Sequence, residues 1–184
     1  VAGFGSAESG FYIGYNGTAL GILYVTGGVR EIQTLTITTA STSTQNVQVV
    51  LNGTSYTVTG MTNSGSTLLT AYQIAQGAFA GWNVEQLGST VVFVAADAGN
   101  KAGAFSVAQS GAGTPVAGSY VETLAGVSST DTWVTQSSWN GDKLDGTGAS
   151  GVTIDPTKGN VFELGIQYLG SGPVTLKCEV VPAG

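Results

Sequence analysis

The sequence predicts a mainly β protein: an antiparallel, jelly-roll-like β-sandwich interrupted by an inserted ββαββ module that holds the only substantial helix. Three observations support this prediction. Apolar and polar residues alternate in many short stretches, which is the period of a half-buried strand. Turn signals separate these stretches, and the chain has 29 glycines. Only 9% of the residues are charged, well below the share in an ordinary globular domain.

The inserted module is expected at residues 38 to 116, and two hairpins frame it. VQVVLNGTSYTVTG predicts a hairpin over residues 46 to 59, because Asn52-Gly53 tolerates the positive φ angles of a type I′ turn. GWNVEQ and TVVFVAA predict a second hairpin about Leu87-Gly88-Ser89, and GAFSVAQS adds a further strand.

The helix of the module is predicted by STLLTAYQIAQGAFAG, with Ser66 or Thr67 as its N-cap. Its apolar residues recur at steps of three and four, which predicts one buried face. That face is expected to hold Leu68, Ala71, Tyr72, Ala75 and Phe79.

The strands outside the module are expected to form a discontinuous sandwich domain, residues 1 to 37 with 117 to 184. Two short N-terminal strands, FYIGYN and GILYVT, do not make a stable sheet alone, so we expect them to pair with C-terminal strands. The last hairpin should alternate on both sides of a turn at residues 170 to 173. Its inward residues are Phe162, Leu164, Ile166, Tyr168, Val174, Leu176, Cys178 and Val180. The segment VAGFGSAESG is a candidate arm that adds to a neighbour's sheet edge.

Charge and residue types exclude several function classes. The net charge of -6 arises from 11 acids and five scattered bases, which cannot neutralise a row of phosphates, so we expect no nucleic-acid partner. The chain has no histidine, which excludes Ser-His-Asp and Cys-His sites. Cys178 is the single cysteine and cannot form an internal disulfide. No run of about 18 apolar residues occurs, so no membrane partner is expected. We predict no enzyme activity and no cofactor.

The stretch GTGASG, residues 146 to 151, matches the glycine spacing of a dinucleotide-binding loop. A phosphate loop needs a strand before it and a helix after it. Here WNGDKLD precedes it, and VTIDPTKGN, broken by Pro156, follows it. The match is therefore a chance product of a glycine-rich chain.

Asn140, Asp142 and Asp145 form a candidate calcium loop, because hard cations favour several oxygens from one flexible segment. The spacing does not fit an EF-hand, which needs an acid where this chain has Gly151. The pattern favours a turn fixed by Asx-type side-chain hydrogen bonds. A glycosidase acid pair, formed by Asp142 with Asp145 or by either of them with Asp155, is a further alternative, which nothing else in the sequence supports.

Two other patterns have a structural and a functional interpretation. Trp82, Trp133 and Trp139 could form a sugar-stacking platform, but their places in or beside alternating strands favour core packing. Asn16-Gly17-Thr18 and Asn52-Gly53-Thr54 match the glycosylation sequon, although Asn52-Gly53 is already explained by turn geometry.

Several stretches together resemble a domain of structural proteins from tailed bacteriophages and large double-stranded DNA viruses. These are FYIGYNGTALGILYVTGGVREIQTLTIT, VVLNGTSYTV, TAYQIAQ, GSTVVFVAADAGNKAGAFSV and QSSWNGDKLDGTGASGVTIDPTKGNVFELGIQYLG. The resemblance implies a virion protein of the capsid surface, tail or fibre. Such a protein packs against copies of itself or other virion proteins, without catalysis. The alternative is a secreted carbohydrate-binding or adhesin β-sandwich module, whose partner would be a glycan.

Overall fold

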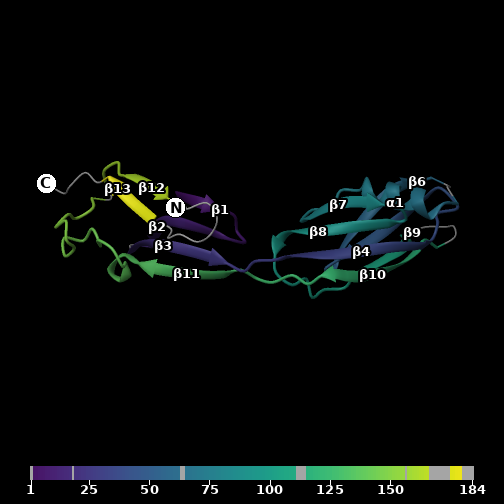
Figure 1. Ribbon diagram of the computed structural model, residues 1–184. Coiled ribbons are helices and arrows are strands. Elements are labelled where there is room, and N and C mark those ends of the chain that lie inside the picture. The colour runs from purple at the N-terminus through teal and green to yellow at the C-terminus, as the bar shows by residue number, and fades with distance from the viewer. Residues whose placement is uncertain are drawn as a thin grey trace. The chain divides into compact units, whose positions relative to one another are not determined.

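The computed structural model describes residues 2–17, 19–62, 65–110, 115–155, 157–165 and 175–179 (Figure 1). Within these residues the chain forms thirteen strands, one α-helix and one short 3-10 turn. The pairings β1–β2, β2–β3, β4–β8, β4–β10, β5–β6, β5–β9, β7–β8 and β12–β13 are antiparallel, so the predicted mainly β, antiparallel fold class is confirmed. None of the helical segments described is long and apolar enough to cross a membrane.

The chain divides into two compact units. Unit 1 combines Val1–Val25 with Asp131–Gly184, and unit 2 is the continuous segment Thr26–Thr130. Unit 1 is thus made of two separate segments, as the sequence predicts for the outer domain, but the boundaries between the two units differ from the expected ones. Strands that the sequence assigns to the outer domain, β4 (Arg30–Thr39) and β10 (Ala117–Leu124), belong to unit 2, because β4 pairs with both β10 and β8 (Thr90–Ala98).

Unit 2 contains two sheets and the helix. The first sheet has the order β10-β4-β8-β7 and the second has the order β6-β5-β9. The strands not yet bounded are β5 (Gln45–Leu51), β6 (Thr54–Met61), β7 (Trp82–Leu87) and β9 (Ser106–Ser110). Both predicted hairpins are confirmed, with Asn52 and Gly53 at φ angles of 51° and 79° in the first turn.

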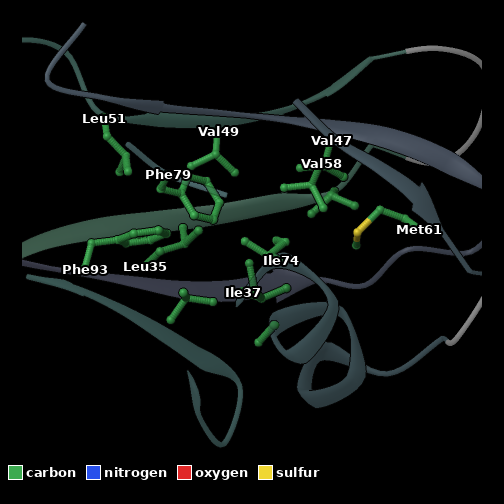
Figure 2. Close-up of a cluster of buried hydrophobic side chains, with 13 residues drawn as sticks. Leu35, Ile37, Val47, Val49, Leu51, Val58, Met61, Ile74, Phe79 and Phe93 are labelled. Carbon is green, nitrogen blue, oxygen red and sulfur yellow. The ribbon is translucent and has the colours of Figure 1, made fainter. Parts of the chain in front are cut away.

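The core of unit 2 explains why its strands alternate. Leu35 and Ile37 of β4, Val47 and Val49 of β5, and Phe93 of β8 are all buried, while their neighbours along each strand are more exposed. Figure 2 shows these side chains converging with those of the helix and β6 in one cluster. Phe79 packs edge-to-face on Phe93, with ring centroids 5.2 Å apart. Burial of this continuous apolar surface is the main stabilising contribution to the unit.

Helix α1 (Thr67–Ala75) begins where the sequence predicts, since the Ser66 side chain accepts a hydrogen bond from the Leu69 N–H. Its buried face is different from the predicted one. Ala71 is buried as expected, but Leu68 and Tyr72 are exposed, and Thr70 and Ile74 lie inside with it. Phe79, beyond the end of the helix, is buried as expected and Ala75 packs on the same cluster, so the predicted stripe is wrong for Leu68 and Tyr72 only.

Thr70 is buried because its hydroxyl is fully used. The Thr70 Oγ1 donates to the Ser66 carbonyl at 2.8 Å and accepts from the Ser41 N–H at 3.0 Å. A buried hydroxyl with both bonds satisfied carries little desolvation penalty. This contact to a residue 29 positions earlier orients the helix, and local periodicity does not contain it.

Unit 1 pairs the two ends of the chain, as the sequence predicts. Its larger sheet has the order β1-β2-β3-β11, and a separate hairpin joins β12 to β13. The strands are β1 (Ala2–Gly5), β2 (Gly10–Asn16), β3 (Ala19–Thr26), β11 (Thr130–Thr135), β12 (Val161–Gly165) and β13 (Thr175–Glu179). The 3-10 turn Gln136–Ser138 follows β11.

Two expectations concern the ends of unit 1. The described part of the last hairpin has the expected register, with Phe162 opposite Cys178 and Leu164 opposite Leu176. Its predicted turn, together with Ile166, Tyr168, Val174 and Val180, lies outside the described residues. In the predicted N-terminal arm, Ala2–Gly5 adds to the sheet of its own chain, beside β2, and addition to a neighbour's sheet edge stays a prediction.

Candidate functional site

The polar loop between Trp139 and β12 is a series of turns closed by aspartate side chains. The Asp142 Oδ1 accepts from the Leu144 N–H at 2.9 Å, and its Oδ2 accepts from the Ser150 N–H at 2.7 Å. These hydrogen bonds, led by that of the Leu144 backbone, lower the pKa of Asp142. The Asp142 carboxylate also explains why position 148 is a glycine, because a Cβ there would lie 2.2 Å from the Asp142 Oδ1.

Asp145 and Asp155 close two turns of the same design. The Asp145 Oδ1 accepts from the Thr147 N–H at 2.9 Å and from its Oγ1 at 2.6 Å. The Asp155 Oδ1 accepts from the Thr157 N–H at 2.9 Å and from its Oγ1 at 2.7 Å. In both cases the threonine side-chain bond is the first cause that lowers the aspartate pKa. These are the Asx-type turns that the sequence favours.

The loop is anchored to unit 1 through Leu144, which has a positive φ of 52°. The Leu144 side chain packs against the second buried cluster, which is centred on Ile13, Leu20 and Ile154. Its carbonyl accepts from the Ile154 N–H at 2.8 Å and from the Gln136 Nε2 at 3.0 Å. Burial of the Leu144 side chain and these two hydrogen bonds together hold the backbone of Leu144 in its strained conformation.

The structure places two of the three candidate calcium ligands at one groove. Asn140 and Asp142 line the same groove, whereas Asp145 lies outside that lining and forms a β-bridge with Thr153. In the part of the chain that the structure describes, no group of three or more acidic or cysteine side chains could hold a metal. The carboxylate oxygens of Asp142 and Asp145 already accept hydrogen bonds within their own turns.

The other chemistries proposed for this loop also lack their geometry. GTGASG is followed by two short β-bridges at Thr153 and Ile154, and not by a helix that could bind a phosphate. A glycosidase pair requires one carboxylic acid with a raised pKa, but Asp142, Asp145 and Asp155 all have lowered pKa values.

The three tryptophans belong to two units, Trp82 to unit 2 and both Trp133 and Trp139 to unit 1. In unit 2, Trp82 packs edge-to-face on Phe105, with ring centroids 5.9 Å apart. In unit 1, Trp133 lies against Gly21, where a Cβ would be 2.6 Å from its ring, and Trp139 packs on the second buried cluster. All three are half-buried, so the structure supports their interpretation as packing residues.

A groove of about 1090 Å³ opens in unit 1 beside this loop. Strands β1 and β2 form one side, the β12–β13 hairpin forms another, and residues 139 to 144 of the loop complete it. The lining includes the aromatic residues Phe4, Phe11, Tyr12 and Trp139 and polar residues from other elements. Those polar residues are Asn140, Asp142, Thr175 and Lys177.

Aromatic side chains form a row beside the groove. Phe4, Phe11 and Tyr24 are register partners on β1, β2 and β3, so their side chains leave the same face of the sheet. The Phe11 and Tyr24 rings lie 4.6 Å apart between centroids. Phe4 is 67% exposed and Tyr24 is 39% exposed. We refer to these three residues as the aromatic row.

Comparison with known proteins does not assign a family. No protein-family model matches the chain, and no curated protein matches it. The functional argument therefore rests on the residues and their geometry.

The sequence pattern singled out Asn140 and Asp142 but missed Phe4, Phe11 and the groove. The alternation of Phe11 and Ile13 shows that Phe11 belongs to a strand face. It does not show that Phe4 is its partner, because the register of β1 on β2 is a tertiary property.

Proposed function

We propose that this chain is a non-catalytic structural protein of a virion, a component of the capsid surface, tail or fibre. It acts by packing against copies of itself or against other virion proteins. The proposal follows from the viral resemblance of the sequence stretches and from one feature of unit 2, the uncovered apolar edge of β10.

Strand β10 is at the edge of its sheet, next to β4, and bears large apolar side chains on its exposed surface. Val121 is 58% exposed, Leu124 is also exposed, and so is Val127, three residues beyond the end of the strand. Isolated proteins usually protect such an edge with lysine, proline or a covering segment. Here Glu122 is the only charged residue of the strand. An apolar edge of this kind favours pairing or packing with another chain.

Electron microscopy of the purified chain tests the proposal. We expect rings, tubes, fibres or shells of regular subunits, and we expect Val121→Lys to convert them into folded monomers, because the charge cannot be buried in the contact. Leu87→Lys is the matched control, since Leu87 is 74% exposed at the β7–β8 turn and lies away from β10. A chain that stays monomeric at high concentration, with no ordered particles, would count against self-assembly.

The alternative function that the sequence leaves open is a secreted carbohydrate-binding or adhesin module. Such a module needs exposed aromatic surface beside hydrogen-bonding groups. The aromatic row and the groove of unit 1, which Trp139 helps to line, have the required composition.

A further inference from the structure

We infer that the groove of unit 1 is a binding site for a neutral oligosaccharide. The inference concerns unit 1 alone and does not depend on whether the chain assembles through β10. Four properties of the described residues support it: the aromatic surface, the polar residues that border the groove, the charge of the lining and the size of the groove.

The aromatic surface is larger than folding of the described unit requires. Phe4 and Phe11 line the groove, and Tyr24 extends the aromatic row across a third strand. Two thirds of the Phe4 surface remains open to solvent. Adjacent strands are about 4.8 Å apart, so three ring positions span roughly 10 Å, which is about two pyranose rings. The C–H faces of sugar rings pack on aromatic side chains, which supply contact area with little loss of conformational entropy.

Polar residues border the same groove from two elements. Asn140 and Asp142 come from the loop after Trp139, whereas Thr175 and Lys177 are on β13, where the Lys177 side chain pairs with Glu163. The amide of Asn140 and the carboxylate of Asp142 offer donors and acceptors for vicinal hydroxyls. An apolar lining with a few convergent polar groups is the usual composition of a small-molecule site.

The charge of the lining favours a neutral ligand. Among the described residues that line the groove, Asp142 is the only acid and Lys177 the only base, so no excess of either charge marks the lining. The Asp142 oxygens also accept two backbone N–H bonds, and the Lys177 Nζ lies 3.5 Å from the Glu163 carboxylate outside the groove. A phosphorylated or strongly cationic ligand would find no matching excess of charge.

The groove is also the right size. Its volume of about 1090 Å³ slightly exceeds the usual range for small-molecule sites, about 300 to 1,000 Å³. It can therefore accommodate a disaccharide or trisaccharide unit of a longer chain.

The test is a titration of the full chain with uncharged hexasaccharides: maltohexaose, cellohexaose, xylohexaose and N-acetylchitohexaose. Calorimetry measures affinity, and tryptophan fluorescence reports on the groove through Trp139. We expect at least one sugar to bind with a dissociation constant in the micromolar to millimolar range. Phe4→Ala should weaken that binding by about fivefold to tenfold, the range for loss of one aromatic contact. Asn140→Ala should weaken it as well, whereas Phe4→Tyr should retain it.

Val161→Ala is the matched control for Phe4→Ala. Val161 is 64% exposed in the same unit but does not line the groove, so its truncation should leave sugar affinity unchanged. Failure of all four sugars to bind at millimolar concentration would overturn the inference. Equal affinity of the wild-type, Phe4→Ala and Asn140→Ala chains would also overturn it. So would a dimer that Phe4→Ala dissociates without any sugar binding, since a second copy would then occupy the groove. A monomer that binds sugar would retain this inference and contradict self-assembly.

Discussion

The side-chain oxygen of Asn52 accepts a hydrogen bond from the backbone N–H of Gly103 at 2.8 Å. The turn of the first hairpin in unit 2 is thereby attached to the segment that leads into β9. The neighbouring Gly53 N–H strengthens this attachment by donating to the Ala104 carbonyl at 2.8 Å. Asn52 therefore has two roles, because it also adopts the positive φ angle that the turn requires.

Replacement of Asn52 separates these two roles. Asn52→Ala loses the hydrogen bond and places a Cβ-bearing residue of poor left-handed propensity at a φ of 51°, so unfolding free energy should fall by about 2 kcal/mol. Asn52→Gly loses only the bond, and about half of that decrease is expected. Urea unfolding followed by Trp82 fluorescence measures both. Equal stability of Asn52→Ala and the wild type would show that the Gly103 contact contributes nothing.

The second prediction concerns Glu31, a carboxylate with no exposed surface at the end of β4. Its Oε1 accepts from the Gln33 Nε2 at 2.8 Å, and its Oε2 accepts from the Lys101 N–H at 2.5 Å. Glu31→Gln puts an NH₂ group opposite one of these donors, and we expect a decrease of about 1–3 kcal/mol in unfolding free energy. Glu122→Gln, on the exposed side of β10, is the control and should change stability by less than about 0.5 kcal/mol. If both variants behave alike, the buried network is not stabilising.

The third prediction concerns pH. Asp142, Asp145 and Asp155 have pKa values below the ordinary 3.8, because each carboxylate accepts hydrogen bonds in the folded loop. A group with a lowered pKa stabilises the fold above its unfolded pKa, and this contribution is lost as pH falls through the folded pKa. The loop should therefore weaken as pH falls below 3.8. Carbon-detected NMR of the aspartate carboxyl groups measures the three titrations directly. Asp142→Asn should flatten the acid dependence, and midpoints at or above the ordinary value would contradict the prediction.

The fourth prediction concerns the close approach of Trp133 to β3. A Cβ at Gly21 would lie 2.6 Å from both the Trp133 ring and the Val134 carbonyl oxygen, and the carbonyl is backbone that cannot move aside. Gly21→Ala should destabilise unit 1 by about 1–3 kcal/mol through overpacking. Gly159→Ala, whose added Cβ would meet open space, is the matched control and should be close to neutral. Hydrogen exchange of the β2 and β3 amides localises the effect to this sheet.

Sequence reasoning was most accurate where the determining interactions are local. The Asn52-Gly53 hairpin, the Ser66 cap and the aspartate turns depend on residues a few positions apart, and all are present. The predicted buried face of α1 differs from the observed one, because the hydrogen bond between Thr70 and Ser41 places Thr70 inside, and periodicity does not encode this contact. The expected domain boundary cut through β4 for a similar reason.

The candidate site shows the same division. Asn140 and Asp142 were identified from one short stretch, but the groove that they line needs β1, β2 and β13 as well. Phe4 becomes a site residue only through its register with Phe11. Strand register and the packing of the last hairpin depend on tertiary contacts, which a single sequence does not reveal.

The division of the chain into two units also sets the order in which these units can fold during synthesis. Val29 and Val127 exchange backbone hydrogen bonds of 2.8 and 2.9 Å, so the two ends of unit 2 meet within one continuous segment. All of that segment is synthesised before Asp131, and β3 has no partner on its β11 side until β11 has formed. Unit 2 can therefore fold during translation, whereas unit 1 must wait for the last third of the chain. Any nascent chain that stops just before Asp131 therefore contains every strand of unit 2 but lacks β11, β12 and β13, half of the strands of unit 1.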